Sequence, residues 1–225
     1  MMSYSFEAFN ELVCGRHSVR GFLPHAVDQH TLHQVFTTAV HAPSNCNTQP
    51  WQVVVVGGET CERLRKRISE AMANGVVQMD FPYDGVYQGV YRERQVDAAR
   101  HLYNAMGISR HDKAGRDAAF MRNFRFFDAP HAAFIFLPEP FGVREAADVG
   151  MYAQTLMLAM TAAGIASCPQ TALSFHAGIV REELALPSHY KLLFGISFGY
   201  ADADHSANKA RPGRAALSES TQFFD

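Results

Sequence analysis

Two arginines stand about one helical turn apart near the start of the chain, in the segment Arg16-His-Ser-Val-Arg20. Arginine presents a planar fork of N–H donors that matches phosphate oxygens, and the Ser18 hydroxyl between the two adds a further donor. A second basic cluster, Lys209-Ala-Arg211, lies near the C-terminus. Either cluster alone is typical of ordinary surface charge. If the two meet in space, they form a small cationic pocket suited to an anionic group.

A polar loop, Ala42-Pro-Ser-Asn-Cys-Asn-Thr-Gln-Pro-Trp51, follows the first cluster and precedes a Val-rich run. Ser, Asn and Pro form turns readily, so the loop can be a simple connection between a helix and a strand. It also carries hydroxyl and amide groups in a row, which are the donors and acceptors that recognise the polar edge of a heterocycle. Taken with the arginines, the loop favours a ligand with an anionic tail and a flat, polar-edged head, such as a phosphorylated cofactor.

Other chemistries have weaker support in the sequence. Cys46 has no basic partner beside it in the chain, so a thiol nucleophile is disfavoured. His30 and His33 have helical i,i+3 spacing, but no HExxH motif or Cys/His pair accompanies them; a solvated helix face is the better interpretation, and we expect no metal site. The cysteines form no CxxC pair, which is typical of reduced thiols in a cytoplasmic protein; they are Cys14, Cys46, Cys61 and Cys168.

The composition excludes several classes of protein. The chain has 225 residues, of which 48% are hydrophobic and 12% aromatic, enough for a sizeable packed core. Its formal net charge of -2 argues against nonspecific nucleic-acid binding. The longest apolar stretches, such as 53–56 and 132–137, are far too short to span a bilayer, and no signal-peptide pattern is visible. We therefore expect a cytoplasmic protein that binds neither membrane nor nucleic acid.

Hydrophobic periodicity predicts the elements of the first half. Apolar residues at helical spacing indicate a helix over Phe6–Cys14. A second helix is expected after Asp28, whose carboxylate suits an N-cap, and it should stop before Pro43. The run 52–56 is β-branched and is followed by two glycines, so we expect a strand buried on both faces. A further helix is expected over Glu62–Ala73.

Hydrophobic patterns also predict the elements of the second half. An apolar strand is expected over 132–137, followed by a helix over 148–163 that is apolar nearly all round. Such a helix belongs at the centre of a fold or at a subunit interface. A short strand and loop then cover 165–172, a helix extends to about Leu186, and a last strand covers 192–200.

Residues 76–128 form the least regular part of the chain, with scattered tyrosines and arginines and a concentration of phenylalanines at its end. A long insertion of this kind is expected to be a lid or a partner-contacting arm. Because no repeat or clear linker is present, we expect one α+β domain over 1–225, with helices around a mixed, mainly antiparallel sheet. A doubly wound order is disfavoured, since strands and helices do not alternate regularly and no Gly-rich turn follows a strand.

Four segments, taken in order, resemble the FMN-contacting segments of the nitroreductase family, and the resemblance covers the chain from about residue 10 to its end. It implies an α+β homodimer with two FMN sites at the subunit interface, each formed by both chains. The segments are Arg16-His-Ser-Val-Arg20-Gly-Phe22, Ala42-Pro-Ser-Asn-Cys-Asn-Thr-Gln-Pro-Trp51, Gly164-Ile-Ala-Ser-Cys-Pro-Gln-Thr-Ala172 and Asn208-Lys-Ala-Arg211.

The resemblance also implies a role for each position. Arg16, Ser18 and Arg20 would follow the phosphate, the ribityl chain and the pyrimidine edge, while His17 would contribute mainly backbone. A cation near N1 and the C2 carbonyl would stabilise the negative charge that gathers there on reduction. Where some members have an acidic residue and glycine, this chain has Thr171 and Ala172, so hydrogen bonding at N5 is left open. The remaining expected contacts are Ser44, Asn45, Asn47 and Gln49 from the partner chain, Pro169, Gln170, Thr171 and Ala172 along one face of the ring, and Lys209 and Arg211 at the phosphate.

The activity implied is that of an FMN-dependent NAD(P)H oxidoreductase. NADPH or NADH would pass a hydride to flavin N5, and an electron-poor acceptor such as a nitroaromatic or quinone would then take its place, which predicts ping-pong kinetics. No catalytic side chain is expected, since the flavin carries the chemistry. The alternatives are dehalogenation, enoate reduction or flavin fragmentation on the same scaffold, a non-catalytic FMN-binding protein, and a Cys46-dependent hydrolase.

Overall fold

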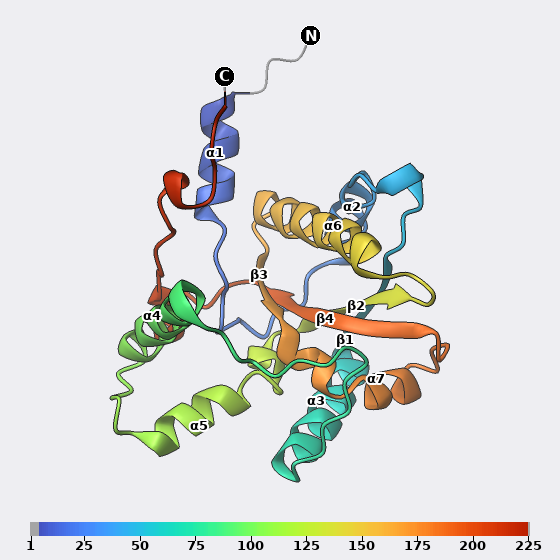
Figure 1. Ribbon diagram of the computed structural model, residues 1–225. Helices are drawn as coiled ribbons and strands as arrows, with labels where there is room; N and C mark the ends of the chain where they lie inside the picture. The colour runs from blue at the N-terminus through green and yellow to red at the C-terminus, as the bar shows by residue number, and fades with distance from the viewer. Residues whose placement is uncertain (1–4, 225) are drawn as a thin grey trace.

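A four-stranded antiparallel sheet lies at the centre of the computed structural model, which describes residues 5–224 (Figure 1). The strand order is β1-β2-β4-β3, and β2 pairs with β4 along its whole length. The predicted strands and the mainly antiparallel sheet are confirmed. The bounds are β1 Gln52–Gly57, β2 His131–Pro138, β3 Ala166–Gln170 and β4 Tyr190–Gly199.

Strand β1 corrects one expectation. Its valines predicted a strand buried on both faces, but β1 lies at the edge of the sheet and Val55 is 38% exposed. The fully buried strand is β2, in which every residue from His131 to Leu137 is buried. β-branched composition favours a strand but does not report its neighbours, and strand order is decided by long-range pairing.

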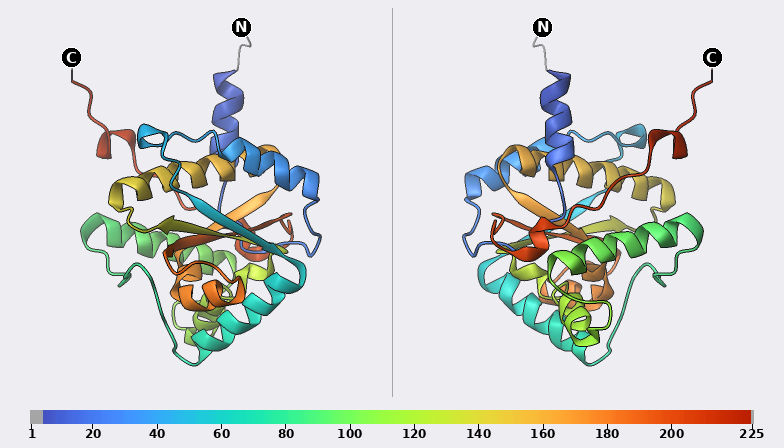
Figure 2. Two further views of the ribbon diagram at one scale, coloured as in Figure 1. Left: turned by 90° about the vertical axis from the view of Figure 1, so that its right-hand side faces the viewer. Right: turned by 90° about the vertical axis from the view of Figure 1, so that its left-hand side faces the viewer.

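One face of the sheet is covered by helices α2 (Gln29–Ala39) and α6 (Val143–Ala162), which pack together. The Asp28 carboxylate caps α2 as expected, accepting the Thr31 N–H at 2.9 Å. Helix α6 begins five residues earlier than predicted and is buried on one side only, since Met151 is 40% exposed. Helix α1 (Phe6–Gly15) touches α6 and then points away from the rest of the chain (Figures 1 and 2).

The other face is covered by α3 (Gly58–Ala73) and the short α7 (Ala177–Glu183), which ends three residues before the expected limit. Leu64 and Ile68 of α3 pack with Phe134 of β2 in a buried apolar cluster. Helix α3 starts four residues before the predicted Glu62, directly after β1. The sheet therefore holds one apolar layer on each side.

The segment 76–128 is more regular than its sequence indicates. It contains helices α4 (Gly89–Ala105) and α5 (Lys113–Met121), set apart from the two helical layers (Figures 1 and 2). Neither helix has a buried residue. A helix that does not pack on the core needs no strong apolar stripe, and α4 has little apolar periodicity. Helix α5 is amphipathic, so its sequence carried a helical signal that the prediction missed.

The C-terminal region consists of β4, the 3-10 turns η4 (Ser206–Lys209) and η5 (Leu217–Glu219), and an extended tail. Phe223 and Phe224 in the tail are 81% and 88% exposed. Within residues 5–224, no helix is both long enough and apolar enough to pass through a lipid bilayer.

Candidate functional site

Asn208 joins the two cation-bearing segments. Its side-chain oxygen accepts the Arg20 backbone N–H at 2.7 Å, and its amide nitrogen donates to the carbonyls of Gly21 and Asp202, both at 2.8 Å. The Asn208 side chain is buried, so each of these polar groups is satisfied inside the protein. The segments around Arg20 and Arg211 therefore lie side by side, as the sequence analysis required of a common pocket.

The first cation segment also lies along the edge of β3. The Val19 N–H donates to the Ser167 carbonyl at 3.1 Å, and Ser18 forms an isolated parallel bridge with Ser167. Cys168, next on β3, is buried beside this segment. Burial raises the pKa of its thiol to about 11, although the Arg20 guanidinium lowers it in part. The thiol thus remains protonated near neutral pH.

Two guanidinium groups lie over the aromatic ring of Phe127. Arg20 lies 5.9 Å and Arg122 5.8 Å from the ring centroid of Phe127. Phe126, Phe127 and Asp128 have φ angles of 58°, 52° and 61°, a conformation that non-glycine residues adopt only when their surroundings hold them there. Sequence reasoning missed Arg122; the only signal was the alternation of arginine with phenylalanine in Arg122-Asn-Phe-Arg-Phe-Phe127.

Two buried polar atoms mark a place where an anionic group would fit. Among the described residues, Arg16 Nη1 and Ser167 Oγ are buried without a hydrogen-bond partner. Both residues line a cavity of about 200 Å3 beside Gly164, at the C-terminal end of α6. A buried guanidinium N–H left unpaired is costly, and a phosphate oxygen is the acceptor that suits it. The donor set fits the phosphate of a cofactor such as FMN.

The other predicted phosphate contacts lie at the end of η4 and just after it. Lys209 and Arg211 are exposed, and the Arg211 guanidinium donates to the carbonyls of Asn208 and Ala210 at 2.6 and 2.9 Å. The His17 ring turns back to the Gly15 carbonyl at 2.9 Å.

The segment Pro169–Ala172 is divided between surface and core. Pro169 and Thr171 are exposed, and Ala172 packs partly against the buried cluster below. Gln170 is only 4% exposed, and its side chain points into the protein. Gln170 therefore presents backbone and not its amide to any ligand on the outer face.

The polar loop has a fixed backbone and exposed side chains. The Asn45 N–H donates to the buried Asp148 carboxylate at 3.0 Å, and Ser44 Oγ accepts the Gln49 N–H at 2.9 Å. Cys46, Asn47 and Gln49 have φ angles of 49°, 55° and 47°. Cys46 Sγ contacts the Asn45 side-chain oxygen at 3.7 Å, which is an amide and not a base. These contacts give no support to a Cys46 nucleophile.

Within one chain, the loop and the cations lie at opposite ends of α6. The loop is tied to Asp148, near the start of the helix, whereas Arg16 lines a cavity with Thr161, near its end. At 1.5 Å per residue the helix separates these points by roughly 20 Å. Figure 1 shows the same separation, with one end of α6 near the loop and the other near β3. One chain alone does not bring the two halves of the predicted site together.

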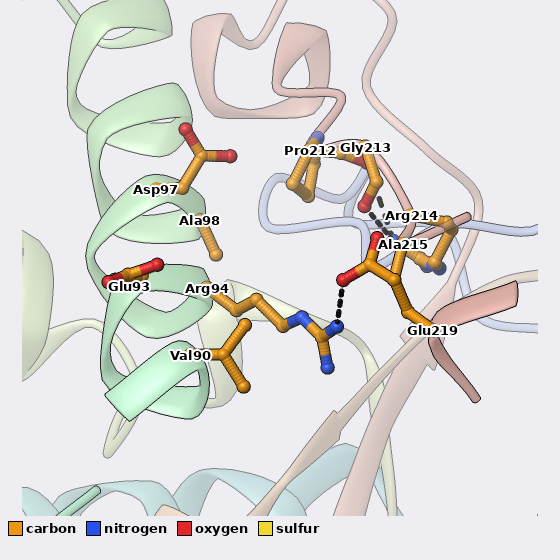
Figure 3. Close-up of a pocket in the computed structure, with 10 residues that line it drawn as sticks. All are labelled: Val90, Glu93, Arg94, Asp97, Ala98, Pro212, Gly213, Arg214, Ala215 and Glu219. Atoms are coloured by element: carbon orange, nitrogen blue, oxygen red, sulfur yellow. Dashed lines mark hydrogen bonds and ion pairs between the residues drawn. The ribbon is translucent and has the colours of Figure 1, made fainter. Parts of the chain in front are cut away.

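A separate cleft of about 620 Å3 lies between α4 and the C-terminal tail (Figure 3). Arg94 of α4 reaches across it and donates to Glu219 at 3.0 Å. Helix α4 also packs against η4, the turn that ends at Lys209. The segment 76–128 thus contacts the element that carries the second cation cluster. In residues 5–224, no group of three or more His, Cys, Asp or Glu side chains is placed to hold a metal ion.

Comparison with known proteins identifies the family of this chain. The model of the nitroreductase family matches residues 13–200. The nitroreductase NfnB of Mycolicibacterium smegmatis is 49% identical over 96% of this chain and 93% of its own. The 4-nitrobenzoate reductase of a Nocardioides species is 34% identical over 89% of this chain and 83% of its own.

A solved structure is similar over nearly the whole chain. The crystal structure of the FMN-dependent nitroreductase NfnB from Mycobacterium smegmatis in complex with NADPH superimposes with a TM-score of 0.93 at 49% identity, covering 97% of this chain and 99% of that one. Because the family model matches most of the sequence and a relative is 49% identical over nearly all of it, this chain belongs to the nitroreductase family.

Proposed function

We propose that this protein is an FMN-dependent NAD(P)H oxidoreductase that reduces electron-poor acceptors, nitroaromatics in the first place. The observation that carries the proposal is the junction at Asn208, which joins two cation-bearing segments. The buried Arg16 Nη1, which has no hydrogen-bond partner among the described residues, adds a donor for an anionic group. The substrates in the relatives' names support the acceptor class, and the NADPH complex of the similar structure supports NADPH as a donor.

The residues of this chain would hold and orient the cofactor. Arg16, Lys209 and Arg211 would neutralise the phosphate, and Ser18 would contact the ribityl chain. Arg20 is pinned through its own backbone, so its guanidinium would stay near the pyrimidine edge, where negative charge accumulates on reduction. When bound, FMN supplies the hydride chemistry at N5. The backbone of Pro169–Ala172 would face the ring, and His17 would contribute main chain.

The proposed assembly is a homodimer in which Ser44, Asn45, Asn47 and Gln49 complete the site of the partner chain. The separation along α6 supports this, because the loop is too far from the cations of its own chain. Exposed apolar residues support a partner as well: Phe6 and Phe9 on α1 are 74% and 56% exposed. The chain would act as one domain in the cytoplasm, where reduced nicotinamide nucleotides are available, with 76–128 as the lid.

The test is spectroscopic. The protein is purified, reconstituted with FMN and freed of excess ligand, and its visible spectrum is recorded before and after anaerobic addition of NADPH or NADH. We expect bound flavin that bleaches with at least one nucleotide and reoxidises when a nitroaromatic is added. Arg20→Ala and Arg211→Ala should each weaken FMN retention by about tenfold or more, the loss of one charge-assisted contact.

Arg100→Ala is the matched control, since Arg100 lies exposed on α4 and pairs only with its helix neighbour Asp97 among described residues. It should retain flavin as the wild type does. A protein that cannot be reconstituted with FMN would refute the proposal. Flavin that binds but stays oxidised with both nucleotides would favour a non-catalytic FMN-binding protein.

A further inference from the structure

The buried side chain of Gln170 makes three hydrogen bonds at the end of β3. Its Nε2 donates to the Asn123 carbonyl at 3.1 Å and to the Asn123 side-chain oxygen at 3.3 Å, and its Oε1 accepts the Ser197 hydroxyl. An amide buried among apolar residues is costly unless it is paired, and when it is fully paired it specifies one arrangement of its neighbours. This network therefore holds β3, β4 and the segment after α5 in fixed relation.

Asn123 is the root of α5. It follows the C-cap residue Arg122, and its own amide donates back to the Phe120 carbonyl of α5 at 2.9 Å. The next residue, Phe124, is fully buried with its ring 5.4 Å from Phe120 and 6.0 Å from Phe175. The C-terminal end of the segment 76–128 is thus attached to the residues that follow β3.

The N-terminal end of the same segment reaches the same place. The Gln78 N–H donates to the Phe175 carbonyl at 2.8 Å, and the Ala177 N–H donates to the Gln78 carbonyl at 3.2 Å. The Tyr83 ring lies 6.3 Å from that of Phe175. Both ends of the segment 76–128 are therefore anchored on the stretch 170–177, and Gln170 is the first residue of that stretch.

We propose that Gln170 is a positioning residue that links Asn123, the point where α5 of the lid is attached, to the backbone facing the flavin. The proposal rests on the function proposed above. The Gln170 side chain does not touch the cofactor. It holds the backbone of Gln170 and Thr171, which would face the ring, at a fixed place relative to Asn123. The Gln170 side chain then determines both the position of α5 and the electrostatic environment of the flavin.

Gln170→Met tests the link, because methionine preserves length and volume but makes none of the three hydrogen bonds. Amide hydrogen exchange measured without flavin should become about tenfold faster in residues 113–123, since their anchor is lost. With FMN bound, the ratio of the affinities for reduced and oxidised flavin should fall about tenfold. For a two-electron couple this corresponds to a midpoint potential lower by about 30 mV.

Two further variants calibrate the result. Ser197→Ala removes only the bond to Gln170 Oε1, and it should shift both measurements in the same direction by a smaller amount. Gln52→Met is the matched control: Gln52 lies on β1 and accepts a hydrogen bond from the Tyr190 hydroxyl at 3.2 Å, away from 113–123. It should change neither the exchange of 113–123 nor the potential.

The outcomes separate the two proposals. A folded Gln170→Met protein with unchanged exchange and unchanged potential would overturn the role of Gln170, even if the enzyme is an active flavoprotein. If Gln170→Met does not fold, the Ser197→Ala variant tests the proposal instead. Wild-type hydrogen exchange in residues 113–123 and a wild-type midpoint potential in that variant would then contradict the role of Gln170. If the wild type binds no FMN, the proposed function fails, while the exchange experiment still tests the attachment of α5.

Discussion

The backbone N–H of Arg20 donates a 2.7 Å hydrogen bond to the side chain of Asn208, 188 positions further along the chain. The same asparagine holds the carbonyls of Gly21 and Asp202. Two distant segments that each carry cations are thereby joined through one buried amide, which keeps like-charged side chains close despite their mutual repulsion. The stability of this junction and the affinity for an anionic ligand should therefore change together.

Asn208→Ala should lower the free energy of unfolding by about 2–4 kcal/mol, because it deletes three hydrogen bonds and leaves buried backbone groups unpaired. FMN retention should fall as well. Asn208→Asp keeps the acceptor for Arg20 but loses both donors, so an intermediate loss is expected. Asn104→Ala, at an exposed position on α4, is the control. Urea denaturation and flavin content after gel filtration measure the two effects; stable, flavin-replete Asn208→Ala protein would contradict the prediction.

Gly21→Ala should disturb the same junction by crowding. A Cβ added at Gly21 would lie 2.1 Å from Cγ of the His205 ring, so the ring or the backbone must move. We expect a loss of about 1–3 kcal/mol, typical of overpacking at a closed position, together with weaker FMN binding. Gly15→Ala is the control, since nothing lies within 4 Å of its added Cβ. Thermal unfolding of both variants checks the prediction, and equal melting temperatures would refute it.

Complementation between defective subunits should reveal the shared site. One chain carries Arg20→Ala; the other carries Asn45→Ala with Asn47→Gly, where glycine suits the φ of 55° at that position. Each homodimer should have low activity. Random reassociation makes half the dimers mixed, each with one intact site, so activity should recover to about a quarter of the wild type. No recovery after verified subunit exchange would place the loop and the cations in sites of single chains.

Cys61 and Cys168 should resist alkylation in the folded protein. Both are buried, and burial raises the pKa of each thiol to about 11, so almost no thiolate is present at mild alkaline pH. Mass spectrometry after iodoacetamide treatment should find these two residues unmodified, whereas all 4 cysteines should react in denaturant. Rapid native labelling of Cys168 would show that the β3 edge opens readily.

Stability should decline on the acid side of neutrality because two histidines are buried in the neutral form. Burial lowers the pKa of His131 and of His176 below the ordinary value of 6.5, and His131 Nε2 accepts the Val27 N–H at 3.0 Å. The unfolded chain then binds protons at a higher pH than the folded chain. Their contribution to stability is complete above about pH 6.5 and is lost as pH falls below it.

Denaturation curves between about pH 7.5 and pH 5 measure this loss. His176→Leu removes one of the two titrations without breaking a side-chain hydrogen bond, since His176 Nε2 has no partner among the described residues. Its unfolding free energy should therefore depend less on pH. The exposed His25→Asn variant should keep the wild-type slope. Equal slopes in all three proteins would rule out His176 as a cause of the pH dependence.

The sequence by itself determined the local elements and the chemistry of the cation segments. The Asp28 cap, the apolar run of β2 and the types of Arg16 and Arg20 are local signals, since capping, hydrophobic periodicity and hydrogen-bonding capacity act over a few residues. They predicted the bounds of most strands and helices to within a few residues. They also indicated an anionic ligand. Helix α4 was missed because a helix without a buried face leaves little periodicity to detect, whereas the short α5 has an apolar periodicity that the prediction overlooked.

Only the tertiary structure decided what depends on distant pairing. It placed the valine run of β1 at the sheet edge and turned Gln170 inward to Asn123. It joined Arg20 to Asn208, and it separated the polar loop from the cations by the length of α6. The physical reason is that each of these relations is set by contacts between residues far apart in the chain, which arise only when the apolar layers pack on both faces of the sheet.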